Sequence, residues 1–197
     1  IVWAVLNNGR FVGMTYRREE KVIAWHEHLL GGTSSVDGKN YDYGFVESVA
    51  VIPGSIDEDQ VYLVIQREVN GATKRHVEFF SGFEFGDNIL NAHFVDSGLT
   101  YSGSPVTSVS GLDHLEGETV SIIADGSTHA SKVVSGGSVT LDRASSDVHA
   151  GLGYTSTLQT MRIDAGGTEG TSQGKTKRIR DVTLRLFRSV GVKVGPS

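Results

Sequence analysis

The sequence contains no cysteine, and this absence excludes several classes of protein at once. Without thiol groups the chain has no disulfide bond, no thiolate-bound zinc or iron–sulfur centre and no cysteine nucleophile. Long hydrophobic runs are also missing, since even the apolar stretch 49–52 is only a handful of residues. Because a transmembrane helix needs roughly 20 consecutive apolar residues, we expect no membrane-spanning segment.

A signal peptide and an initiating methionine are not found at the start of the sequence, which opens at Ile1. We therefore expect the 197 residues to be a fragment or a processed form of a longer protein. A long helical periodicity is lacking too, so we expect little helix.

Charge is distributed unevenly along the chain. The whole sequence carries a net charge of −5, but residues 171–197 contain seven basic side chains against one acid, Asp181. This stretch therefore carries +6, and the other 170 residues carry −11. Such asymmetry is typical of a segment that binds nucleic acid, and equally of complementary surfaces in a self-assembling protein. The candidate contacts to DNA or to a neighbouring subunit are Lys175, Lys177, Arg178 and Arg180.

Alternating apolar and polar residues predict strands along most of the chain. In the first part these are 1–6, 11–16, 21–28, 45–52, 60–69 and 73–80, with tight turns at Asn7-Asn8-Gly9 and Asn70-Gly71. Residues 30–44, rich in Gly, Ser, Asp and Asn, are predicted to form a long exposed loop. The result is two successive antiparallel three-stranded meanders, each close to the length of a propeller blade.

Residues 94–126 combine strand patterning with many glycines. Gly98, Gly103, Gly111, Gly117 and Gly126 each follow Ser, Glu or Asp and are predicted to close tight turns. Before this segment, 81–93 is expected to be a connector with one helical turn near 87–92. After it, strands are predicted at 131–134, 138–141, 147–151, 154–162 and 180–188, with a flexible loop near 165–175.

These patterns predict an all-β protein built from antiparallel sheets in two parts. Residues 1–84 are expected to form a propeller-like or sandwich unit, and residues 94–197 a small β-sandwich or barrel. Two blades alone cannot close a propeller. Either further blades precede Ile1, or the two meanders pack on each other.

The patterns that point to catalysis or metal binding are weak. His26 and His28 share one face of a predicted strand, but a metal needs a third ligand, and the other histidines stand at no recognisable spacing. Asp113 and His114 are adjacent, so on an extended backbone their side chains point apart, which argues against a proton relay. We expect no catalytic residue, no metal site and no cofactor.

A further class of function, carbohydrate binding, depends on aromatic side chains. Trp3 and Trp25 lie within patterned strands and are expected to fill the core. Tyr41 and Tyr43 lie in the predicted loop, so they are the candidate surface-binding aromatics.

Leu112 and Leu115 are expected to anchor a turn in the core, while Asp113, His114 and Glu116 bind backbone groups or face a neighbour.

Eight short strings follow one another along most of the chain. They are WHEH (25–28), VESVAVIP (46–53), FVDSGLTY (94–101), VSGLDHLEGETV (109–120), IIADG (122–126), SGGSVTL (135–141), VHAGLGY (148–154) and QGKTKRI (173–179). Together and in this order they resemble the C-terminal part of the tail nozzle, or tail tubular protein B, family of short-tailed bacteriophages and prophages.

The resemblance implies a non-enzymatic structural component of a virion. Proteins of this family form a hexameric ring or tube at the distal tail, contain propeller-like β repeats and enclose the channel through which the genome leaves. The implied partners are other copies of the chain, adjacent tail proteins and DNA in passage. The implied location is the phage tail, after synthesis in the bacterial host cytoplasm. The alternative is a β module of a tail protein that binds carbohydrate or the host surface.

Overall fold

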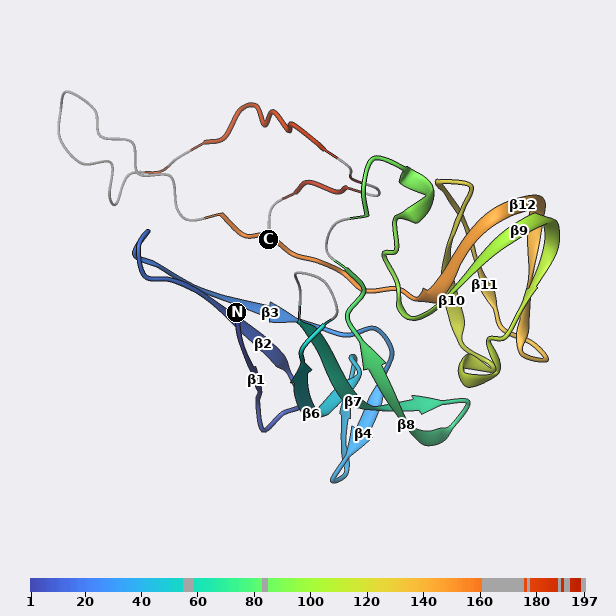
Figure 1. Cartoon of the computed structure of the whole chain (residues 1–197), viewed down its shortest axis with the longest axis horizontal. Helices are drawn as coiled ribbons and strands as arrows, with labels where there is room; N and C mark the ends of the chain where they lie inside the picture. The colour runs from blue at the N-terminus through green and yellow to red at the C-terminus, as the bar shows by residue number, and fades with distance from the viewer. Residues whose placement is uncertain are drawn as a thin grey trace. The chain divides into compact units, whose positions relative to one another are not determined.

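The structure is a computed structural model that describes residues 1–54, 59–82, 85–160, 176, 178–187, 189 and 192–195. By its internal contacts the chain divides into two compact units, Ile1–Ser156 and Thr157–Ser197. The described residues form twelve antiparallel strands and two short 3-10 helices, and they contain no α-helix (Figure 1). The predicted all-β class with antiparallel sheets is confirmed, and none of the four sheets in this part of the chain closes into a barrel.

The first sheet is a meander of β1 (Val2–Val5), β2 (Phe11–Arg17) and β3 (Val22–His28), in that order. Its β1–β2 turn forms at the predicted place. Gly9 in this turn has φ +76°, a left-handed backbone that glycine adopts without the steric cost of a Cβ atom. The turn is fastened to the next sheet, because the Val46 N–H donates to the Gly9 carbonyl at 2.9 Å.

The second meander consists of β6 (Phe45–Ile52), β7 (Gln60–Val69) and β8 (Ala72–Phe79), again in consecutive order. Asn70 and Gly71 have φ of +50° and +70°, so they close β7 onto β8 in the primed type of turn that hairpins favour. Both three-stranded meanders predicted from the alternation of residues are therefore confirmed.

The prediction of a long exposed loop over 30–44 is wrong. The segment folds into a hairpin of β4 (Ser34–Val36) and β5 (Lys39–Tyr41). It also buries Leu30, Ser34 and Tyr43, and the Ser34 hydroxyl donates to the Tyr43 carbonyl at 2.7 Å. The Gly, Ser and Asn content correctly indicated turns, but the polar groups find partners within the protein and the apolar side chains join the core.

The third sheet has the order β11-β10-β12-β9, and its strands follow a 3-10 turn, η1 (Ile89–Asn91), at the predicted position. Its elements are β9 (Asp96–Ser110), η2 (Asp113–Leu115), β10 (Thr119–Ala124), β11 (Ser127–Val133) and β12 (Ser138–Leu152).

The predicted turns at Gly98 and Gly103 are wrong, because β9 runs through both. Register shifts against β12 show that this long strand is irregular instead of folded back.

The strand predicted at 154–162 is not formed over 154–160, and the one predicted at 180–188 is not formed over 180–187. Residues 161, 162 and 188 and the predicted flexible loop near 165–175 lie outside the described residues.

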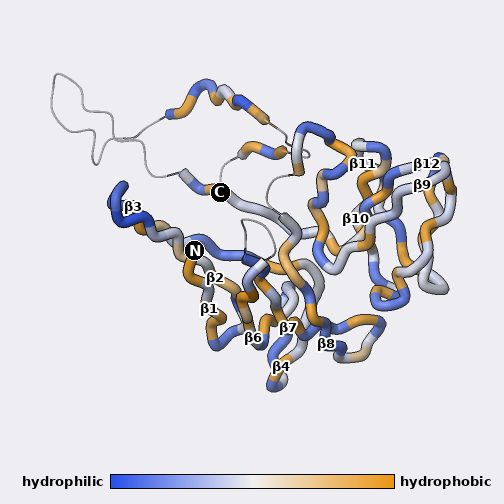
Figure 2. Tube along the Cα trace, in the orientation of Figure 1, coloured by the Kyte–Doolittle hydropathy of each residue, from blue (hydrophilic) through white to orange (hydrophobic). Residues whose placement is uncertain are grey.

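Two clusters of buried side chains form the interior of the first unit. One, the meander core, contains Phe11, Val46, Leu63 and Ile65, with Trp3 packed against it. The other, the C-terminal sheet core, contains Leu112 and Leu115, which are fully buried as expected, and ten further residues of 109–152. Figure 2 shows these apolar stretches in orange along the strands.

Trp25 does not fill a core. Its side chain is 65% exposed, so the prediction from its strand position is wrong.

Candidate functional site

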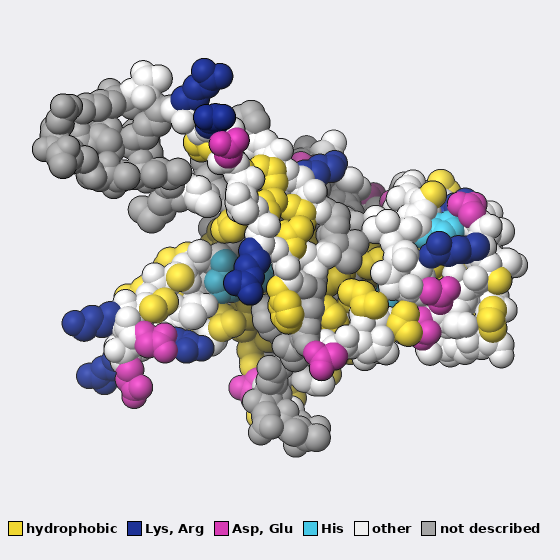
Figure 3. Space-filling model, turned by 90° about the horizontal axis from the view of Figure 1, so that it is seen from above, with side chains coloured by type: hydrophobic (Ala, Val, Ile, Leu, Met, Phe, Trp, Pro, Cys, Tyr) yellow, Lys and Arg dark blue, Asp and Glu magenta, His cyan; other side chains and the backbone are white. Residues whose placement is uncertain are grey.

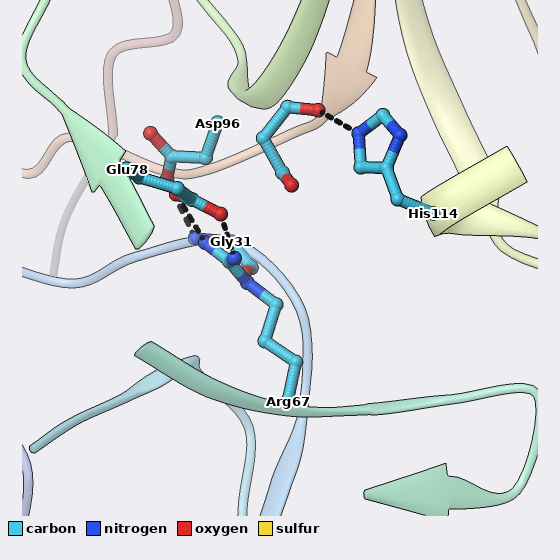
Figure 4. Close-up of polar contacts among 6 residues, drawn as sticks. Gly31, Arg67, Glu78, Asp96 and His114 are labelled. Carbon is cyan, nitrogen blue, oxygen red and sulfur yellow. Dashed lines mark hydrogen bonds and ion pairs between the residues drawn. The ribbon is translucent and has the colours of Figure 1, made fainter. Parts of the chain in front are cut away.

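The guanidinium of Arg67, which projects from β7, is the centre of a buried polar junction. Its side chain is fully buried, and its Nε–H donates to the Gly31 carbonyl at 2.7 Å. Its two terminal nitrogens form an ion pair with the Glu78 carboxylate from β8, with Nη2 and Oε2 at 3.1 Å (Figure 4). A buried guanidinium needs such partners, because removing its hydration costs several kcal/mol that only paired charge and hydrogen bonds offset.

Asp96, the first residue of β9, completes this junction. Its carboxylate accepts a hydrogen bond of 2.6 Å from the Gly31 N–H. Burial raises the pKa of Asp96 from its ordinary value, while the Gly31 N–H and the nearby Arg67 charge act in the opposite direction. Gly31 therefore bonds through its carbonyl to the second meander and through its N–H to the third sheet. This ties the two cores together.

A shallow hollow of about 480 Å³ lies between the β7–β8 hairpin and η2. His76 and His114 face each other across it, with ring centroids 6.0 Å apart. The His114 Nε2 lies 2.9 Å from the Ser97 carbonyl, whereas the buried Nδ1 of His76 has no hydrogen-bond partner among the described residues. Burial, and then the Arg67 charge, lower the pKa of His76. The hollow is lined by Val69, Asn70, Ala72, Lys74, His76, Asp113, His114 and Glu116.

The acidic groups beside this hollow bind backbone donors. Glu116 accepts hydrogen bonds from the Gly136 and Gly137 N–H groups at 3.0 and 2.8 Å, and Glu118 accepts one from Asn70 N–H at 3.2 Å. The expectation that this turn satisfies backbone groups is therefore confirmed for Glu116. The extended backbone expected for Asp113 is wrong, because Asp113 opens a 3-10 turn.

Six of the seven histidines occur as three close pairs: 26 with 28, 76 with 114, and 93 with 149. His26 and His28 share a face of β3 as predicted, with Nδ1 and Nε2 2.8 Å apart. Among the residues that the structure describes, no group of three or more His, Cys, Asp or Glu side chains is placed to hold a metal ion. In the first pair both rings contact Trp3, and in the third pair His149 Nε2 lies 2.7 Å from the Leu90 carbonyl.

The two candidate surface aromatics have different environments. Tyr43 is only 6% exposed and donates its hydroxyl to the Asn8 carbonyl at 3.1 Å, so it supports the fold. Tyr41 is half-buried in β5 and lines a second hollow of about 520 Å³. The other lining residues of this hollow are Thr33, Ser34, Ser35, Asn40, Asp42 and Glu68.

The candidate cationic contacts are only partly described. Arg178 and Arg180 are exposed, and the Arg180 Nε lies 3.6 Å from the Asp181 carboxylate. Lys175 and Lys177 lie outside the described residues.

Ser172 also lies outside the described residues. It stands in the string Gly-Thr-Ser-Gln-Gly at 170–174, which matches the spacing of a nucleophile elbow.

A surface feature that the sequence did not predict is the exposure of apolar side chains on both meanders. Tyr16, Ile23 and Trp25 are 55–65% exposed in the first, and Val77 and Phe79 are 73% and 57% exposed in the second. Figure 3 shows such hydrophobic side chains at the surface beside charged ones. The signal was present in the run Val22-Ile23-Ala24-Trp25, which is apolar at every position, whereas a strand with one solvated face alternates.

Comparison with protein-family models and with curated proteins finds no match to this chain. Within the described residues, no helix has the length and hydrophobicity needed to cross a membrane.

Proposed function

We propose that the chain is a non-enzymatic structural component of a phage or prophage tail, a nozzle or tubular protein that contributes to the tail tip and the genome-exit channel. Its partners are other copies of the chain and adjacent tail proteins, and DNA passes it during genome release. Its place is the virion, after synthesis in the cytoplasm of the bacterial host.

The observation that carries this proposal is the ordered set of strings resembling the tail nozzle family. Seven of the eight lie on the strands and turns of the first unit, where they supply β3, β6, β9, β10 and β12 and the turns between them. FVDSGLTY contains Asp96 of the polar junction, and VSGLDHLEGETV contains Leu112 and Leu115 of the C-terminal sheet core. The resemblance therefore extends over residues that hold both cores.

The exposed apolar side chains of the meanders also support an assembly role. Large contiguous apolar patches are uncommon on monomeric proteins and mark interaction surfaces. Trp25 and Phe79 lie on different sheets and are both more than half exposed, so each meander offers apolar surface for a neighbour.

Immunogold electron microscopy tests the proposal on virions of the phage or prophage that encodes the chain. Antibodies raised against residues 1–156 should label the distal end of the short tail, and mass spectrometry of purified virions should detect the chain. Antibodies to the major capsid protein serve as the control for particle integrity. Virions without the chain, or labelling confined to the capsid, would contradict the proposal.

The alternative function is carbohydrate or host-surface binding, and the hollow at Tyr41 favours it. An aromatic ring beside amide, hydroxyl and carboxylate groups is a suitable environment for a sugar, because the ring stacks and the polar groups hydrogen-bond. A glycan array distinguishes the two functions. Binding that Tyr41→Ala abolishes and Tyr62→Ala leaves intact supports the alternative, and an array without signal argues against it.

A further inference from the structure

Strand β3 is an open sheet edge that has no lysine, proline or bulge to block further pairing. It pairs only with β2 among the described residues, in a continuous register from Val22 to His28. Edge strands usually carry a lysine, a proline or a bulge, because each of these blocks the addition of another strand. The seven residues of β3 contain no lysine, arginine or proline.

The other edges of these sheets have such features. β8 carries Lys74 and Arg75, β11 carries Lys132, and β9 contains Pro105 together with register shifts. β6 has a register shift after Val46, and β1 is only four residues long. Among the described edges of the three larger sheets, β3 is therefore the one best suited to accept a strand.

Strand β3 also exposes large apolar side chains on one of its faces. Ile23 and Trp25 lie on the same face and are each 65% exposed, and Tyr16, the partner of Ile23 on β2, is 55% exposed. An added strand with apolar side chains on this face would cover them, and cross-strand apolar pairs of this kind stabilise sheets.

Residues 178–186, the donor segment, have the pattern of a strand but form none. Val182, Leu184 and Leu186 recur at every second position and are 49–57% exposed. Figure 2 shows the described C-terminal stretch alternating between hydrophobic and hydrophilic residues. A segment with strand patterning and an apolar side that is half exposed is suited to pairing with a sheet edge.

We propose that residues 178–186 of one copy of the chain add as a fourth strand to the edge of β3 in a second copy. Val182, Leu184 and Leu186 then lie on the face of Ile23 and Trp25. Arg178, Arg180 and Arg185 give the donor segment a net positive charge, and the first 170 residues of the second copy carry −11, so the overall charges of donor segment and acceptor copy are opposite.

Donor and acceptor are different surfaces of the chain, so the contact is head-to-tail. Repetition of such a contact produces a closed ring or an open filament, depending on the rotation between copies. This inference concerns how copies join and does not depend on the tail assignment. Its failure would leave the virion-labelling test unaffected.

Cysteine cross-linking tests the pairing directly, because the natural chain has no cysteine. A protein with Ala24→Cys is mixed with a second protein carrying Thr183→Cys and oxidised mildly. A covalent dimer of the two different proteins is expected. The matched control replaces Ala24→Cys with Val77→Cys on the β8 edge, where cross-linking should be at least about tenfold lower.

Self-association of the cysteine-free chain is measured by sedimentation velocity over a range of concentrations. Ile23→Lys and Leu184→Asp should each weaken it by about tenfold or more. Val133→Lys and Leu158→Asp introduce the same charges at residues outside the meanders that are 59% and 92% exposed, and both should leave it unchanged. All four positions are exposed, and circular dichroism verifies that each variant remains folded.

Two results would overturn the proposal. One is a chain that stays monomeric at every concentration and yields no mixed dimer. The other is a monomer carrying both Ala24→Cys and Thr183→Cys that cross-links internally while the mixed proteins do not, which would mean that the donor segment pairs within its own copy.

Discussion

Arg67 is the largest of the fully buried side chains in the described part of the molecule. Because its charge is buried, the stability of the fold depends on the groups that pair with it. The Glu78 carboxylate and the Gly31 carbonyl compensate its charge. Glu78 comes from the neighbouring hairpin strand β8, whereas Gly31 is 36 residues away in the sequence. A buried ion pair stabilises little by comparison with apolar packing, but removal of one partner leaves the other charged and desolvated.

Arg67→Met is therefore expected to lower the free energy of unfolding by about 3–5 kcal/mol. Arg75→Ala provides the control, because the Arg75–Glu47 pair lies at the surface, where such pairs contribute about 0–1 kcal/mol. Urea unfolding followed by circular dichroism measures both. Equal losses in the two variants would show that burial of Arg67 has no special energetic importance.

Three half-buried histidines make stability depend on pH. Burial lowers the pKa of His28, His76 and His93, and the electrostatic interaction with one neighbour lowers each further: His26, Arg67 and His149, respectively. In the unfolded chain these rings take up protons near pH 6.5, which the folded rings resist. Their contribution to stability is thus complete above pH 6.5 and declines as the pH falls below it.

His28→Phe should reduce this decline. His28 packs against Trp3, Phe11 and Phe80 with centroid distances of 5.4–5.7 Å, so a phenyl ring suits the site and removes the titration. Unfolding temperatures measured from pH 8 to pH 5 should fall less for the variant than for the natural chain. A parallel fall in both would exclude His28 as a source of the acid sensitivity.

At the scale of the elements, the hairpin turns show how far local sequence determines structure. Gly9 and Gly71 have similar φ of +76° and +70°. A Cβ atom added at Gly9 would lie 2.3 Å from the Phe45 ring, whereas a Cβ atom added at Gly71 would have no described atom within 4 Å. Both turns therefore need a residue with positive φ, but only Gly9 is also packed against another side chain.

Gly71→Ala is expected to cost about 1–2 kcal/mol, the strain of a left-handed alanine. Gly9→Ala should cost about 1–3 kcal/mol more, because the Phe45 ring must move. Thermal unfolding of the two variants measures the difference. Equal losses would show that the Phe45 ring shifts without cost.

The β4–β5 hairpin and strand β9 mark where element prediction failed. Gly, Ser and Asn indicated turns in 30–44, but they did not reveal that Leu30 and Tyr43 would be buried against other elements. In β9 the glycines at 98 and 103 follow serine as turn glycines do, yet the strand continues through both, and each lies at a break in its register with β12. Tertiary contacts overrode the local preference in each case.

At the scale of the whole molecule, two cores share one compact unit. The hydrogen bonds Gly31–Asp96 and Asn70–Glu118 connect the meander side to the C-terminal sheet, and the ring contact between His76 and His114 adds to them. Both tryptophans of the chain, Trp3 and Trp25, lie in β1–β3 and so report only on the meander side.

Leu115→Ala in the C-terminal sheet core should cost about 2–5 kcal/mol. If the cores unfold together, tryptophan fluorescence should shift to lower urea concentration by as much as circular dichroism. A fluorescence transition that stays unchanged while circular dichroism shifts would show that the cores unfold separately, and that the junction at Arg67 couples them weakly.

Local sequence is enough to predict the strands of the meanders, the positions of the turns at Gly9, Gly71 and Gly126, and the anchoring of Leu112 and Leu115. These features depend on alternation and backbone conformation within a few residues, which a sequence displays directly. The burial of Arg67 and Tyr43 and the exposure of Trp25 depend on the three-dimensional fold. Their environments come from partners far along the chain, as in the 65 residues that separate Gly31 from Asp96, and local periodicity carries no information on such pairs.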